Sequence, residues 1–157
     1  MSSFACGFPA VIYRQVRDTL GIGMTNRTIA LKWYRQARHD LEMAEKNIPI
    51  GGCDVAAFLC QQSVEKLLKA ILIQETGNMP KTRYLDELSD LFGIEGELRA
   101  DILDLTPDYT FTRYPDVSAQ VPFEEYDRSV AVEKVERCKT IFSRLAHRAH
   151  PIHGSES

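Results

Sequence analysis

The chain has 157 residues, of which 44% are hydrophobic and 26% are charged, and its net charge at pH 7 is −3. That length fits one domain with a buried core, and the charge gives no global reason to expect a nucleic acid or an anionic membrane as a partner. Because no run approaches the roughly 18 apolar residues that span a bilayer and no signal peptide is evident, we expect a cytoplasmic protein without membrane association.

Residues 1–24 form an extension before the first clear helical pattern. Apolar side chains recur there at helical spacing, at Val11, Ile12, Val16 and Leu20. They would line a short helix from Pro9 to Gly21. The alternative is that Met24 is the natural start and that residues 1–23 are loosely attached. The sequence favours neither interpretation.

A long amphipathic helix is expected next, beginning between Thr25 and Thr28. Its apolar face repeats at intervals of three and four residues and consists of Ala30, Trp33, Ala37, Leu41, Ala44 and Ile48. Pro49, Gly51 and Gly52 end it.

A second, more apolar helix has Asp54 as its expected N-cap, and Gly77 and Pro80 mark its end. Its wide apolar face consists of Ala57, Cys60, Val64, Leu67, Leu68, Ile71 and Leu72. We expect a helix of this character at the centre of a bundle. The four cysteines of the chain show no C-x-x-C pair and no metal-like spacing. Cys53 and Cys60 lie two helical turns apart in this apolar segment and are expected to be reduced, packed thiols.

Two shorter helices are predicted after it. The first has Thr82 as a candidate cap, Gly93 as its end and an inward face of Leu85, Leu88, Leu91 and Phe92. The second is acidic, is marked by Leu98, Ile102 and Leu105, and stops before Pro107. Residues 106–122 contain three prolines and three aromatic residues without a sustained period, which predicts a loop.

The last helix is predicted to start at Pro122 and to end at Pro151, before a disordered tail of residues 151–157. Its inward seam consists of Val135, Cys138, Phe142, Leu145 and Ala149. No segment alternates with period two, which argues against a sheet. Residues 25–150 are therefore predicted to form one all-α domain, an antiparallel up-and-down bundle of four to five helices.

The second helix carries a polar stripe of Gln62, Lys66 and Lys69, and Glu65 precedes Lys69 by four residues. One interpretation is a solvated face with a single surface ion pair. The other is a polar groove where two ammonium groups meet an anionic ligand or partner. Both remain open.

A second candidate site surrounds Arg113, which stands next to Tyr114 and three residues before Asp116. A guanidinium in such a setting stacks on rings, pairs with a carboxylate or holds a phosphate. Asp116 would orient it. The pattern allows a structural clamp, with Asp40 or Glu65 as the internal partner, or a contact with a ligand or RNA.

Three separate motifs resemble those of the HEPN domain family, named for a nucleotide-binding domain of higher eukaryotes and prokaryotes. They are Trp33 with Ala37, Asp40, Leu41 and Ala44; then Gln62, Glu65, Lys66, Leu68, Lys69 and Ala70; then Arg113, Tyr114, Pro115 and Asp116. The resemblance covers roughly residues 29–149. It implies a helical bundle that usually forms a homodimer and that often pairs with a minimal nucleotidyltransferase in a toxin–antitoxin module.

Many members of that family are metal-independent ribonucleases that use an arginine followed, after four to six residues, by a histidine. Here positions 118, 119 and 120 hold Ser118, Ala119 and Gln120, so that histidine is missing after Arg113. The spacing recurs as Arg144 with His150, and as Arg148 with His153, close to what chance predicts. We expect no metal site in the histidines at 147, 150 and 153, and no cofactor.

Two hypotheses follow. The first is a dimeric binding module that partners a nucleotidyltransferase and binds a nucleotide, with a ligand-binding set of Asp40, Glu65, Lys66, Lys69, Arg113, Tyr114 and Asp116. The alternative is a ribonuclease toxin that acts on RNA, with Arg113, or Arg144 together with His150, as the catalytic candidates.

Overall fold

Helices make up the regular structure of residues 25–150, the part of the chain that the computed structural model describes. In chain order they are α2 (Asn26–Asn47), α3 (Cys53–Thr76), α4 (Leu85–Leu91), α5 (Gly96–Asp104), α6 (Asp108–Arg113), α7 (Pro122–Glu125) and α8 (Arg128–Ala149). None of these helices has the length and apolar character needed to cross a bilayer. The expectations for residues 1–24, for the tail 151–157 and for His153 lie outside the described residues.

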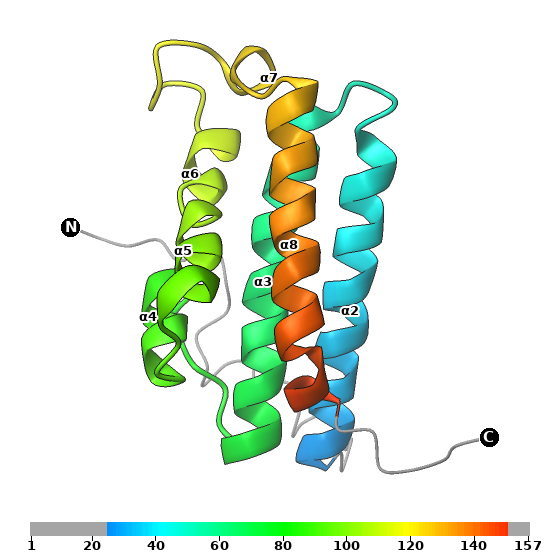
Figure 1. The fold of residues 1–157 in the computed structure, drawn as a ribbon, viewed down its shortest axis with the longest axis vertical. Helices are drawn as coiled ribbons and strands as arrows, with labels where there is room; N and C mark the ends of the chain where they lie inside the picture. The colour runs from blue at the N-terminus through cyan, green and yellow to red at the C-terminus, as the bar shows by residue number, and fades with distance from the viewer. Residues whose placement is uncertain (1–24, 151–157) are drawn as a thin grey trace, which may run out of the picture.

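The helices form four columns (Figure 1). Helices α2, α3 and α8 are long rods, and α2 runs antiparallel to the other two. Helices α4, α5 and α6 follow one another along α3 in the opposite direction to it, so together they act as the fourth column. We call these three helices the arm. This arrangement confirms the all-α, antiparallel up-and-down bundle, with the fourth column divided into three short helices and α7 added at one end.

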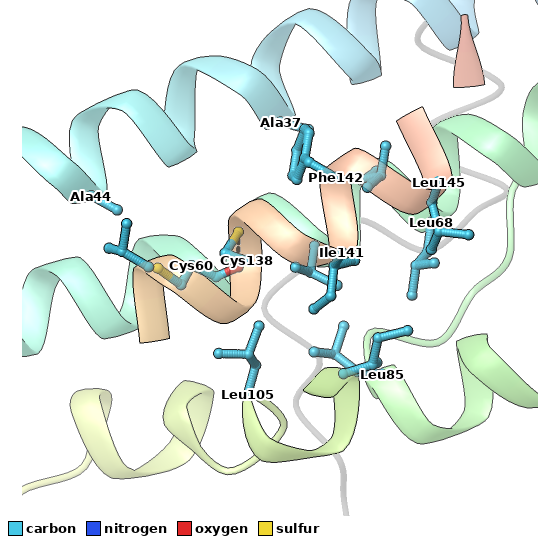
Figure 2. Packing of buried hydrophobic residues seen from close by; sticks show 14 of the residues in the cluster. Ala37, Ala44, Cys60, Leu68, Leu85, Leu105, Cys138, Ile141, Phe142 and Leu145 are labelled. Carbon is cyan, nitrogen blue, oxygen red and sulfur yellow. Dashed lines mark hydrogen bonds between the residues drawn. The ribbon is translucent and has the colours of Figure 1, made fainter. Parts of the chain in front are cut away.

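Helix α3 lies at the centre, in contact with α2, α8, α4, α6 and α7. The complete predicted apolar faces of α3 and α8 are buried. Figure 2 shows Leu85 and Leu105 of the arm reaching into the same core as Ile141 of α8. Burial of this continuous apolar surface is the main source of stability for the bundle.

Two thiols meet in this core, Cys60 on α3 and Cys138 on α8 (Figure 2). Both are fully buried, and the sulfur of Cys138 lies 3.8 Å from the carbonyl oxygen of Cys60. The neighbouring Cys138 thiol, together with burial, raises the pKa of Cys60. Cys53, Cys60 and Cys138 are all buried free thiols in this structure, as predicted for Cys53 and Cys60.

The ends of α2 and α3 follow the sequence closely, with one correction. The Thr25 hydroxyl accepts the Thr28 N–H at 3.2 Å and caps α2, and Gly77 ends α3 in the left-handed region at φ 73°. Asp54 is not the N-cap of α3. That position is Gly52, and Asp54 lies in the first turn, where its charge suits the positive end of the helix.

The first short helix also differs from expectation. Its N-cap is Tyr84, because Thr82 uses its hydroxyl to accept the N–H of Tyr84 at 3.1 Å and forms a local turn before the helix. Leu91, expected to face inward, is 60% exposed. A helix of seven residues has only two turns, so it buries Leu85 and Leu88 and leaves its last position outside.

The prediction of a loop through residues 106–122 is wrong in its first half, and the single helix predicted from Pro122 is divided into two. Helix α6 occupies Asp108–Arg113, since Pro107 holds a helical φ of −70° just before it and the side chains of Asp108 and Tyr109 are buried. Helix α7 begins at Pro122 as expected, but it ends at Glu125. A separate helix, α8, then starts at Arg128. Its N-cap is Asp127, which has an extended backbone and whose carboxylate accepts the Val130 N–H at 2.9 Å.

Candidate functional site

The polar stripe of α3 forms a network with α2. The ammonium group of Lys66 pairs with the carboxylate of Asp40, which is only 5% exposed. The Gln36 amide donates to the same carboxylate at 2.8 Å. The charge of Asp40 is therefore neutralised inside the α2–α3 interface.

One turn along α3, Lys69 pairs with Glu65 at 2.8 Å, and the Gln62 amide donates to Glu65 at 3.4 Å. The ammonium group of Lys69 also lies 5.8 Å from the centre of the Trp33 ring on α2. Lys69 is 9% exposed, so the interpretation of this stripe as a solvated face with one surface ion pair is wrong. The stripe is a partly buried network of ion pairs and hydrogen bonds that joins α2 and α3.

A second cluster forms where the chain before α4 meets α6. The guanidinium of Arg83 donates to the hydroxyl oxygen of Tyr109 at 2.9 Å, and the guanidinium of Arg113 donates to the same oxygen at 2.6 Å. The two guanidinium carbons lie 4.6 and 4.9 Å from the centre of the Tyr109 ring. Two guanidinium groups thus converge on the hydroxyl of one buried phenol.

Tyr109 is the buried residue that both arginines contact. Its side chain is buried, and its ring packs against that of Phe58 on α3 at 6.2 Å between centres. Phe58 and Gln62 are four residues apart on one helix, so they lie on the same flank of α3. The arginine cluster and the lysine network therefore follow one another along the same flank.

The structure corrects the expected internal partner of Arg113. Asp40 and Glu65 are occupied by Lys66 and Lys69, whereas Arg113 contacts Tyr109 and is exposed. Sequence reasoning missed Arg83 as a member of the cluster. Its contact with Tyr109 joins positions 26 residues apart, and no local spacing signals such a pairing.

Tyr114 and Asp116 follow directly on the exposed chain after α6. Arg144 and His150 are instead on α8, where His150 is the C-cap and its ring lies 5.9 Å from the Tyr34 ring. Helix α6 lies near the end of the bundle where α8 begins (Figure 1). Arg113 and the C-terminal pair are therefore at opposite ends and do not form one site within the chain.

A buried polar group anchors the helix that carries Tyr109. Asp108, the first residue of α6, is 2% exposed, accepts the Tyr126 hydroxyl at 2.7 Å and pairs with Lys134 of α8 at 2.9 Å. Burial raises the pKa of Asp108, although Lys134 and Tyr126 oppose the shift. Burial and the bond to Asp108 raise the pKa of Tyr126. Burial lowers the pKa of Lys134, but the carboxylates of Asp108 and Asp104 outweigh this effect, so the net shift of its pKa is upward.

A sequence model of the HEPN domain matches residues 30–146 of this chain. The chain belongs to the HEPN domain family. The HEPN match runs from α2 to α8 and includes both polar clusters.

Two solved structures support the HEPN assignment. The crystal structure of TT1696 from Thermus thermophilus matches with 26% identity and a TM-score of 0.67, over 76% of this chain and 97% of that one. The crystal structure of ST0689, described as an archaeal HEPN homologue, matches with 28% identity and the same TM-score and coverage. No curated protein sequence matches this chain.

Proposed function

We propose that this HEPN-family chain is a dimeric binding module that holds a nucleotide by its phosphates at Arg83 and Arg113. In this proposal the module partners a minimal nucleotidyltransferase in a toxin–antitoxin system, and its ligand is the nucleotide which that enzyme uses. The partner and the dimer rest on family membership. The phosphate site rests on the geometry around Tyr109.

The observation that carries the proposal is the convergence of Arg83 and Arg113 on the Tyr109 hydroxyl. Arginine presents donors in a planar fork that matches two phosphate oxygens, and two forks on one ring would enclose a di- or triphosphate. Exposed Tyr114 provides a ring beside them for the base, and Asp116 a carboxylate for the ribose hydroxyls or the base.

In this proposal the lysine network, formed by Lys66 and Lys69 with their carboxylate partners, is the wall of the same site: it borders the site and supports it. Lys66 and Lys69 are already paired with carboxylates, so in the proposal they fix the distance between α2 and α3 instead of providing the first phosphate contacts. Asp40 and Glu65 act through these lysines. Loss of this wall should weaken ligand binding less than loss of the arginines.

Isothermal titration of the purified chain with ATP, GTP and their diphosphates tests the phosphate site. Arg83→Ala and Arg113→Ala should each weaken binding about tenfold, which corresponds to about 1.4 kcal/mol. Arg113→Lys should rescue little, since a single ammonium cannot reproduce the fork. Arg128→Ala, an exposed arginine of α8 outside the cluster, is the matched control. Unchanged affinity in the Arg83→Ala/Arg113→Ala double variant would refute the site.

The assembly is tested separately. Light scattering should give the mass of a dimer, and the chain should co-purify from its native host with a small nucleotidyltransferase. A chain that elutes alone and without nucleotide would contradict this part of the proposal. Metal-independent cleavage of RNA that both Arg113→Ala and His150→Ala leave unchanged would point to a contaminant, whereas cleavage abolished by either substitution would establish the ribonuclease alternative.

A further inference from the structure

A separate basic surface covers the first half of α2. Four cations and no carboxylate occur over residues 26–39, namely Arg27, Lys32, Arg35 and Arg38. All four side chains are exposed. A chain with a net charge of −3 therefore concentrates positive charge on one segment of one helix.

The second half of α8 continues this charge. No carboxylate occurs after Glu136 within α8, and Arg144 and His147 are exposed near its end, followed by His150 at the C-cap. Arg148 donates to both carboxylate oxygens of Glu75, at 2.8 and 2.9 Å, so its charge is paired. Arg144 is therefore the arginine of this half of α8 that contributes positive charge to the surface.

The two halves lie side by side. The Tyr34 ring of α2 lies 5.9 Å from the His150 ring and 6.5 Å from the Phe142 ring, so it joins α2 to the last turns of α8. Arg27 and Arg38 are seven and four residues from Tyr34, which places both on the same side of α2. We call the joined set the α2–α8 basic surface; it consists of Arg27, Arg35, Arg38, Arg144, His147 and His150.

Among the described residues, these arginines have no acidic partner that would neutralise them. Within residues 25–150, no carboxylate lies within ion-pair distance of Arg27, Arg35, Arg38 or Arg144. Glu42, one helical turn after Arg38 on α2, is bound by Lys46 at 2.6 Å. The hydrogen bond from Lys46, with smaller contributions from His39 and Arg38, lowers the pKa of Glu42. The surface therefore keeps a net positive charge.

From this arrangement we infer that the α2–α8 basic surface binds the sugar–phosphate backbone of a nucleic acid. Arg27 and Arg38 are eleven positions apart and so are separated by about 16 Å along the helix, which matches about five phosphates of one strand at about 3.4 Å each. Arginine suits phosphate geometry, and the Tyr34–His150 pair in the middle provides rings on which an unpaired base can stack.

This site is independent of the proposed nucleotide site. The nucleotide site is formed by α6 and the segment before α4, and includes Arg83, Tyr109 and Arg113. The α2–α8 basic surface lies instead along α2 and α8, at the end of the bundle where α2 begins and α8 ends (Figure 1). Substitutions can therefore separate the two activities within the full chain.

Fluorescence anisotropy with a labelled 20-nucleotide oligouridine, the matching DNA strand and a duplex tests the inference, at salt concentrations from about 50 to about 200 mM. The Arg35→Ala/Arg38→Ala variant should bind at least about tenfold more weakly at the lowest salt concentration. Its slope of log affinity against log salt should be shallower by about 1.4 for a single strand, since each phosphate contact contributes about 0.7. Alanine favours helix at these exposed positions, so the variant should fold normally.

The matched control is Lys81→Ala/Arg128→Ala, which removes two exposed cations elsewhere and should change neither affinity nor slope. Arg83→Ala/Arg113→Ala should also keep oligonucleotide binding, while Arg35→Ala/Arg38→Ala should keep nucleotide binding if the proposed function holds. Absence of binding to all three probes at the lowest salt concentration would overturn the inference. Equal loss in the control variant would overturn it as well, because binding would then depend on overall charge alone.

Discussion

The hydroxyl of Tyr126 can be removed without leaving a large cavity, because phenylalanine keeps the ring. That hydroxyl donates at 2.7 Å to Asp108, and the two residues are 6% and 2% exposed. A hydrogen bond to a charged group contributes about 1.5–3 kcal/mol, and water cannot replace it at a buried carboxylate. Tyr126→Phe should therefore lower the free energy of unfolding at pH 7 by about 2 kcal/mol.

The loss should depend on pH in a direction fixed by Asp108. Burial raises the pKa of Asp108 above its ordinary value of 3.8, so the folded protein holds this proton more tightly than the unfolded chain does. Stability consequently falls as pH rises from the unfolded pKa through the folded pKa. Removing the Tyr126 hydroxyl takes away one group that opposes the shift. The difference between wild type and variant should thus be small near pH 3.5 and larger at pH 7.

Urea denaturation followed by circular dichroism measures this effect, and the dependence of unfolding on urea should keep its slope in the variant. Tyr84→Phe is the matched control, since Tyr84 is 49% exposed and the ring that Arg83 approaches is retained. The control should change stability by less than about 0.5 kcal/mol. If Tyr126→Phe matched the control at every pH, the buried hydrogen bond would contribute nothing and the anchoring of α6 through Asp108 would be refuted.

Three further substitutions test other parts of the fold by the same denaturation assay. Leu68→Ala, at a fully buried position, should cost about 2–5 kcal/mol, and a loss below about 1 kcal/mol would mean that the core collapses around the gap. Lys66→Met leaves the carboxylate of Asp40 without its cation and should cost about 3 kcal/mol, whereas Lys46→Met on the surface should cost less than about 1 kcal/mol. Gly77→Ala should destabilise by about 1 kcal/mol because Gly77 has a φ of 73° and a Cβ there would meet the Asn26 amide at 2.6 Å; an unchanged midpoint would show that the turn adapts.

Helices α2, α3 and α8 could be predicted from the sequence because each repeats an apolar face over about five turns or more. Over that length the period of 3.6 residues cannot be mistaken for another pattern. The faces read from the sequence are the buried faces of α3 and α8 in the structure. The stop at Gly77 was equally predictable, since a left-handed residue after a helix has a strong local preference for glycine.

Helix α6 could not be predicted in this way. It has six residues, too few to display a period, and it is stabilised by tertiary contacts of Asp108 and Tyr109. Lys134 pairs with Asp108 from a distance of 26 residues in the chain. Such a pairing depends on how the columns pack, and no local pattern in one sequence records it.

The candidate site was found in part. The Glu65–Lys69 pair was predicted from its spacing of four residues within α3, whereas the Lys66–Asp40 pair follows from the crossing of α2 and α3. Arg113 was identified by its setting among aromatic residues. Its actual contact, Tyr109, precedes it by one helical turn, and this relation became visible only once the supposed loop proved to be a helix.

The division of the arm into three short helices has a consequence for its dynamics. None of the three is long enough to persist in isolation, so their amide hydrogens should exchange with solvent sooner than those of α3. Arg83 precedes the first of these helices and Arg113 ends the last, and both reach the same tyrosine. An anion bound by both guanidinium groups would link the segment before α4 to the end of α6. Ligand binding should then slow the exchange of amide hydrogens throughout the residues between Arg83 and Arg113.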